Sequence, residues 1–151
     1  MKWTRIVLLI LTLLAAWWAW QRFFVSDETR IRLQLVTMAR AVEQGNILKL
    51  EGAIATDYTD DFGMDKSTLL AGIAQYRQQH DGLFIHLSDI QIEVQPDHQK
   101  ARALLIAKVV SKSKSGATES DLFSDRFRLF FRNNDRHWQL IRVESPELKF
   151  D

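Results

Sequence analysis

The sequence contains no cysteine, only two prolines and only six glycines among its 151 residues. Without cysteine, the chain has no thiolate nucleophile, no disulfide framework, no cysteine-ligated metal and no site for a lipid-modified cysteine. The formal net charge is only +1, so no overall positive charge points to a nucleic-acid partner. We therefore exclude thiol chemistry and expect no nucleic acid as a partner.

The sequence also lacks the short motifs that identify many enzymes. It has no glycine-rich phosphate loop and no serine nucleophile elbow. Its four histidines, at positions 80, 86, 98 and 137, form no HxH or HxxxH pair, and such pairs are the usual start of a histidine metal site. We therefore expect neither a bound metal nor a cofactor.

One long hydrophobic run stands at the start of the chain. Residues Ile6–Trp20 carry no charge, and extending the run to Val25 gives the 20 residues that a membrane span needs. Lys2 and Arg5 precede the run, and basic residues favour the cytoplasmic side of a membrane. We predict that residues 1–25 form a transmembrane or signal-anchor helix in the lipid bilayer. The remaining chain would lie outside the cytoplasm, on the periplasmic side of a bacterial inner membrane. A cleaved signal peptide is the alternative.

Residues 26–151 have the length of a single domain that folds without disulfides. Apolar residues recur at spacings of three and four in three segments, each preceded by a capping residue, and this pattern is typical of amphipathic helices. The predicted helices are Ser26–Gln44, Ile47–Thr56 and Lys66–His80. Asp57–Gly63, between the second and third, is predicted to be a turn or a short edge strand.

The segment Leu83–Val94 is predicted to be one long strand with a bend in its middle. Its apolar residues occupy odd positions up to Leu87 and even positions from Ile90. Since successive strand side chains point to opposite faces, this change of parity requires one extra residue. Ser88 and Asp89 lie at the change, so we predict a β-bulge there and a curled sheet with a hollow on its concave side.

Three further strands follow, joined by short turns, and they are predicted at 101–113, 122–133 and 137–144. A second bulge is predicted in the last of them, where Leu140 and Ile141 are both apolar. Strands that follow one another through short turns form an antiparallel meander. The predicted fold class is therefore α+β, with three N-terminal helices packed on a curved four-stranded antiparallel meander, preceded by the membrane helix.

Five segments carry a resemblance to a known superfamily: Ala53–Phe62, Lys66–Leu70, Ile90–Val94, Ala101–Ala103 and Trp138–Val143. In this order they resemble nuclear transport factor 2-like proteins, the cone-shaped α+β barrels, over about residues 27–145. The resemblance implies a fold and a pocket inside the cone. It implies no particular reaction, because the superfamily includes isomerases, dehydratases, hydrolases, carriers and interaction domains.

The densest polar cluster, Asp57–Asp61, contains the candidate pair Asp57 and Tyr58. A carboxylate beside a phenol in an apolar hollow transfers protons next to carbonyl groups, and steroid isomerases of the superfamily use a tyrosine and carboxylates in this way. The sequence departs from their pattern, since its first helix has no tyrosine and no strand shows a carboxylic acid flanked by apolar residues. His86 is the third candidate, provided that its face of the bent strand turns into the hollow. The structural alternative for the polar cluster is a solvated loop in which Tyr58 packs on the core. For His86, the alternative is a histidine on the outer surface of the sheet.

These observations predict a membrane-anchored, non-catalytic domain of the cell envelope that binds a protein or a small apolar ligand. The alternative is a small acid–base enzyme of the isomerase, dehydratase or hydrolase type. An open hollow with two titratable groups favours the enzyme, whereas a hollow plugged by aromatic side chains disfavours it. The outward arginines Arg126, Arg128 and Arg132 predict a basic sheet face for an acidic protein partner or anionic lipid headgroups, and Phe130 among them points to a second copy of the chain. The alternative is a solvated outer face of the sheet.

Overall fold

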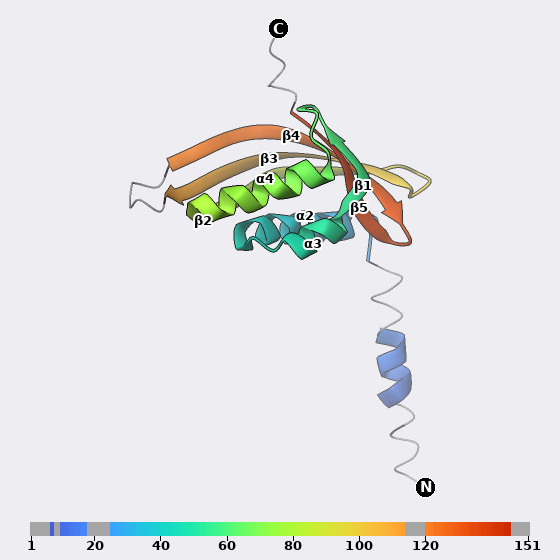
Figure 1. Ribbon diagram of the computed structural model, residues 1–151. Helices are drawn as coiled ribbons and strands as arrows, with labels where there is room; N and C mark the ends of the chain where they lie inside the picture. The colour runs from blue at the N-terminus through green and yellow to red at the C-terminus, as the bar shows by residue number, and fades with distance from the viewer. Residues whose placement is uncertain (1–6, 8–9, 18–24, 114–119, 146–151) are drawn as a thin grey trace.

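The computed structural model describes residues 7, 10–17, 25–113 and 120–145. Three helices lie against one face of a curved sheet (Figure 1). The helices are α2 (Asp27–Gln44), α3 (Ile47–Ala53) and α4 (Lys66–Gln79). The strands are β1 (Ile54–Asp60), β2 (His80–Val94), β3 (Lys100–Ser113), β4 (Ser120–Asn134) and β5 (His137–Glu144). Their order across the sheet is β1-β5-β4-β3-β2.

The prediction of a four-stranded antiparallel sheet is wrong, because the sheet has five strands and is mixed. Strands β2 to β5 do form the predicted antiparallel meander. The fifth strand, β1, adds to its edge parallel to β5, with Ile54 opposite Leu140. The predicted second helix therefore ends at Ala53 and not at Thr56. The strand partner of β1 is more than 80 residues away in the sequence, so local periodicity gives no sign of the pairing.

The predicted bend in β2 is confirmed. Between its pairs with Ile106 and Leu104, β2 has one residue more than β3. Asp89 lies at this point with φ 51°, a left-handed backbone conformation that aspartate tolerates better than most residues. As a consequence, Leu87 and Ile90 both pack against the core although their positions differ in parity.

The left-handed backbone of Asp89 leads to a prediction about stability. Asp89→Gly is expected to change the free energy of unfolding by less than about 1 kcal/mol, because glycine adopts positive φ without steric cost. Asp89→Val is expected to destabilise the protein by about 1–2 kcal/mol, because a β-carbon branch crowds the backbone in this conformation. Urea denaturation of both variants measures the difference, and equal midpoints would show that the bulge does not need this conformation.

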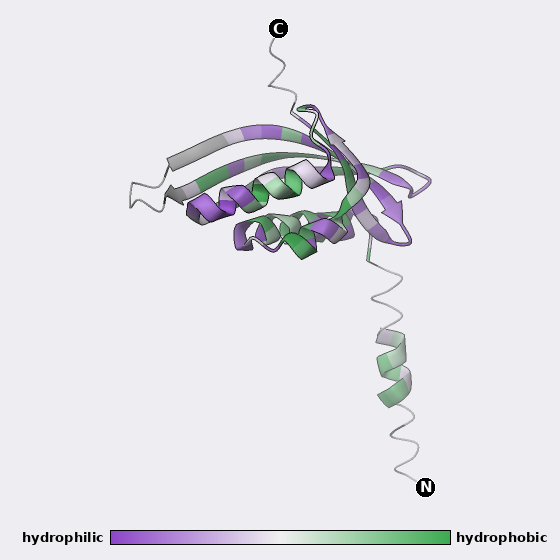
Figure 2. Ribbon diagram, in the orientation of Figure 1, coloured by the Kyte–Doolittle hydropathy of each residue, from purple (hydrophilic) through white to green (hydrophobic). Residues whose placement is uncertain are grey.

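A second bulge, also predicted, lies in β5. Phe130 pairs with Arg142 and Phe131 pairs with Leu140, which leaves Ile141 as the extra residue. The core lies between the inner face of the sheet and the helices, and the middle of β3 is accordingly hydrophobic (Figure 2). The most deeply buried large side chains of the core are Ile31, Leu50, Ile54 and Phe131.

Helix α4 packs more loosely than its two neighbours. None of its residues is fully buried, and Leu69 and Ile73 are only partly buried against the core. The helix ends at Gln79 and β2 begins at His80 without a break, whereas the sequence predicted a helix to His80 and a strand only from Leu83. The loose packing leaves space between α4 and the sheet.

The cap of α4 makes stability depend on pH. The Asp65 carboxylate accepts hydrogen bonds from the Thr68 backbone N–H and the Ser67 hydroxyl, each at 2.8 Å, and these bonds, chiefly that of Thr68, lower the pKa of Asp65 to about 2. A lowered pKa stabilises the fold above the ordinary value of about 4, and this contribution is lost as pH falls toward 2. Asp65→Asn keeps an acceptor but cannot titrate. Its melting temperature is expected to fall less between pH 4 and pH 2 than that of the wild type. Calorimetry at both pH values measures this, and equal slopes would contradict it.

No helix within the described residues is long and apolar enough to cross a membrane. The predicted anchor, residues 1–25, lies largely outside the described residues. Its described positions, 7 and 10–17, are helical, and their large apolar side chains are exposed. The membrane anchor and the location outside the cytoplasm therefore stay predictions.

Candidate functional site

An apolar hollow of about 630 Å³ lies between the helices and the inner face of the sheet. This volume is within the range of about 300–1,000 Å³ that is usual for small-molecule sites. All three helices of the domain contribute to its lining, together with β1, β4 and β5. The apolar wall includes Leu50, Ile54, Leu69, Ile73, Phe127 and Val143.

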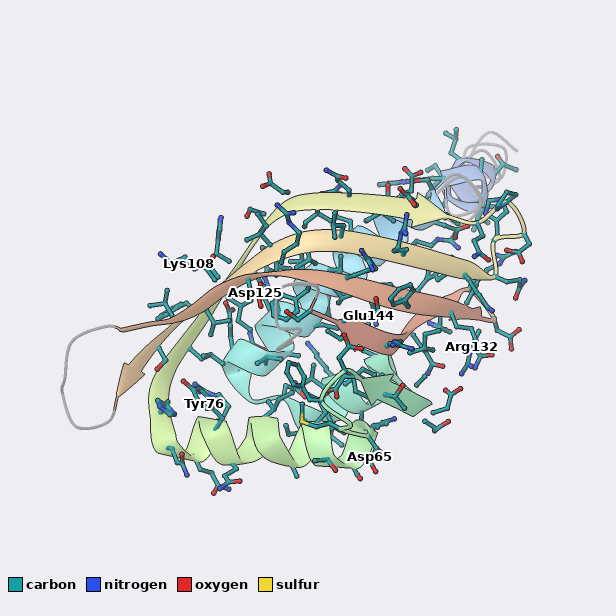
Figure 3. All side chains as sticks on the ribbon, turned by 90° about the horizontal axis from the view of Figure 1, so that it is seen from above. Asp65, Tyr76, Lys108, Asp125, Arg132 and Glu144 are labelled. Carbon is teal, nitrogen blue, oxygen red and sulfur yellow. The ribbon has the colours of Figure 1, made fainter. Side chains whose placement is uncertain are left out.

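Four polar residues interrupt this apolar wall. Tyr58 and Asp60 come from β1, whereas Ser124 and Asp125 come from β4. The two strands are separated by β5 in the sheet. Polar groups therefore enter the hollow from two separate strands. Figure 3 shows Asp125 on β4, seen from above the sheet.

Tyr58 is 3% exposed and donates a long hydrogen bond of 3.4 Å to Asp60 Oδ2. Burial, and then the nearby charge of Asp60, raise the pKa of Tyr58 far above its ordinary value. The phenol therefore stays protonated at neutral pH and is able to donate a hydrogen bond. The other oxygen of Asp60, Oδ1, accepts the backbone N–H groups of Phe62 and Met64, each at 2.9 Å. These two bonds hold the carboxylate at the end of β1.

Asp125 is held from two sides on the inner face of β4. Its Oδ2 accepts a hydrogen bond of 2.8 Å from the hydroxyl of Ser145, which is itself buried. Its Oδ1 accepts the backbone N–H of Arg126 at 2.7 Å. Because the carboxylate is partly buried and lines the hollow, it is the group best placed to accept a proton from a bound molecule.

Sequence reasoning missed Asp125, although a signal was present. Asp125 stands between Ser124 and Arg126, so it has no apolar residue directly beside it in the sequence. Neighbours on one face of a strand are two positions apart. Asp125 has the same parity as Phe127, which also lines the hollow. Applying strand parity to acids as well as to apolar residues would have found it.

Of the three residues singled out from the sequence, only Tyr58 lines the hollow. Asp57 is exposed and forms two hydrogen bonds of 2.8 Å with the Arg132 guanidinium; these bonds hold the pKa of Asp57 below its ordinary value. His86 is exposed on β2, opposite Lys108 of β3 in the strand register. Neither residue is among those that line the hollow.

Aromatic side chains of β4 and β5 leave the hollow unfilled. Phe127 forms part of the wall, while Phe131 and Trp138 are buried in the core. The hollow is therefore open and is lined by a phenol and two carboxylates. Among the described residues, no three histidine, aspartate or glutamate side chains gather closely enough to hold a metal ion.

No protein-family model and no curated protein matches the sequence. Solved structures do resemble it. A conserved protein from Planctomyces limnophilus is 18% identical with a TM-score of 0.70, and the match covers 79% of this chain and 94% of that one. For a nuclear transport factor 2-like superfamily protein from Salmonella enterica, the identity is 9%, the TM-score 0.67 and the coverage 82% and 94%.

A third solved structure is a protein provisionally named scytalone dehydratase, from Novosphingobium aromaticivorans. It is 13% identical with a TM-score of 0.68, and the match covers 76% of this chain and 78% of that one. Identities this low show a shared fold and no shared activity. The chain thus has the fold of nuclear transport factor 2-like proteins, as the sequence resemblance implied.

Proposed function

We propose that this chain binds a small, largely apolar molecule and transfers a proton on it, as isomerases and dehydratases do. The observation that carries the proposal is the presence of Asp125 and the Tyr58–Asp60 pair in one apolar hollow. An open hollow with several titratable groups favours the acid–base enzyme over the non-catalytic domain that the sequence first suggested. The small apolar ligand expected from the sequence becomes the substrate in this proposal.

Three of the four polar residues have a role that follows from their contacts. The Asp125 carboxylate is the proposed base, because its two hydrogen bonds hold it in place on the inner face of β4. The protonated Tyr58 hydroxyl is the proposed donor to an oxygen atom on which negative charge develops. Asp60 is a positioning residue, since it accepts from Tyr58 and is fixed by backbone N–H groups. The apolar wall excludes water and strengthens these electrostatic interactions.

The names of similar structures agree with this class of reaction. Proteins provisionally named as dehydratases, from Novosphingobium aromaticivorans and Streptomyces avermitilis, share the fold at 13% and 14% identity. Both names describe those proteins and not this chain. They support proton transfer as a reaction for which the fold is suited.

Proton exchange at carbon tests the proposal without knowledge of the natural substrate. Full-length protein in D₂O is mixed with cyclohexanone, 2-cyclohexenone or α-tetralone, and loss of the proton signal next to the carbonyl is followed by NMR. We expect the protein to accelerate exchange in at least one ketone. The neutral apolar dye N-phenyl-1-naphthylamine should suppress this acceleration by occupying the hollow. Absence of acceleration with all three ketones, or acceleration that the dye leaves unchanged, would contradict the proposal.

A further inference from the structure

We propose that the hollow selects an apolar molecule whose head group donates hydrogen bonds and carries positive charge, such as a primary amine, and that it disfavours carboxylates. This inference rests on the proposed function in one respect, namely that the same hollow binds the substrate. It adds the charge class of the molecule. The inference is based on the negative charge of the polar lining residues and on their capacity to accept hydrogen bonds.

Both charged residues of the described lining are acids. Asp60 and Asp125 line the hollow, and no lysine, arginine or histidine is among the residues described there. The remaining polar side chains of the lining are the hydroxyls of Tyr58 and Ser124. A ligand in the hollow therefore meets negative charge and apolar surface.

Two arginines of the strands that line the hollow, Arg128 and Arg142, form ion pairs with acids outside it. Arg128 of β4 lies 3.2 Å from Glu144. Arg142 of β5 lies 3.2 Å from Asp61 and 3.0 Å from Glu144. None of these four side chains is among the described lining residues. The two arginines therefore provide no positive charge for an anion inside the hollow.

The two carboxylates of the hollow keep acceptor capacity for a ligand. A carboxylate has about four lone-pair positions. In the described structure, Asp125 receives one bond on each of its oxygens, and Asp60 Oδ2 receives only the long bond from Tyr58. Against these acceptors, the described lining residues with a hydroxyl donor are Tyr58 and Ser124. The lining therefore has more free acceptors than free donors, which is the complement of an ammonium or hydroxyl group.

Charge and hydrogen-bonding capacity both favour an ammonium group over a carboxylate group in the hollow. An ammonium group that enters the hollow exchanges water for carboxylate acceptors of opposite charge. A carboxylate group loses its water, finds few donors and is repelled by two like charges. The apolar wall lowers the local dielectric constant and increases both effects.

Three probes of equal chain length test the inference: hexylamine, hexanol and hexanoate. Each displaces N-phenyl-1-naphthylamine from the full-length protein at pH 7 and constant ionic strength, and dye fluorescence reports the affinity. We expect hexylamine to bind at least about tenfold more tightly than hexanoate, with hexanol between them. Hexanoate binding as tightly as hexylamine would overturn the inference and leave the proposed function standing. Failure of all three probes to displace the dye would overturn both.

Variants connect the selectivity to the two carboxylates. In the double variant Asp60→Asn with Asp125→Asn, the affinity ratio of hexylamine to hexanoate is expected to fall to less than about threefold. Asparagine keeps an acceptor oxygen and a similar size, so the hollow should keep its shape. If the double variant fails to fold by circular dichroism, each single variant should show a smaller fall. Asp57→Asn removes an acid outside the hollow and should leave the ratio unchanged. A ratio that is the same in the wild type and in the folded hollow variants would refute the assignment.

Discussion

Asp125→Asn is expected to slow proton exchange at carbon by about two to four orders of magnitude, the usual contribution of a positioned general base. The carboxamide cannot accept the proton that the Asp125 carboxylate accepts, although it can still bond Ser145 through its oxygen. The rate should therefore fall while dye binding in the hollow stays within about twofold of the wild type. NMR exchange rates and dye titrations on the same sample measure the two quantities.

The matched control for this variant is Asp57→Asn. It makes the same chemical change to a carboxylate that is exposed, pairs with Arg132 and does not line the hollow. The exchange rate of this control should equal that of the wild type. Thermal melts of both variants establish that they fold. Equal rates for Asp125→Asn and the wild type would remove Asp125 from the mechanism.

Phe131→Ala is expected to lower the free energy of unfolding by about 3–5 kcal/mol. Phe131 has no exposed surface and is part of the core on the inner face of β4. Removing its ring loses buried apolar area and leaves a cavity that the strands on either side are unable to fill. Urea denaturation, with the slope compared between variants, measures the loss.

The control for this variant is the preceding residue of the same strand. Phe130 is only partly buried and lines a surface hollow with Arg102 and Ile141. Phe130→Ala removes the same atoms, yet it is expected to cost only about 1 kcal/mol. Similar losses for the two variants would show that the two faces of β4 are not buried as the structure describes. Binding of a second copy of the chain or of a protein partner to the face of Phe130 stays a prediction.

Local pattern predicted most of the fold correctly. The caps of Asn46 and Asp65, the left-handed Gly45 that ends α2 and the bulge at Asp89 were all readable from residue types and spacing. Each of these features depends either on the backbone preference of a single residue or on a hydrogen bond to a residue a few positions away. The tight turn after β4, with positive φ at Asp135, belongs to the same class.

The candidate site was only partly predictable. Tyr58 was found, but its sequence neighbour Asp57 turns to Arg132 outside the hollow, and Asp60 and Asp125 enter it instead. Adjacent residues of a strand face opposite sides of the sheet, so polar residues that are neighbours in the sequence do not lie together in the structure. The pairing of β1 with β5 decides which residues of β1 line the hollow together with those of β4.

The sequence by itself determined the α+β class, the three helices, the bent strand and the absence of thiol chemistry. These features follow from interactions over a few residues, or from composition. Tertiary structure alone decided the parallel pairing of β1 with β5, the loose packing of α4 and the presence of Asp125, Tyr58 and Asp60 in one hollow. Those features depend on how separate segments pack together, as in the pairing of Ile54 with Leu140, and their free energy comes from burial that no single segment achieves alone.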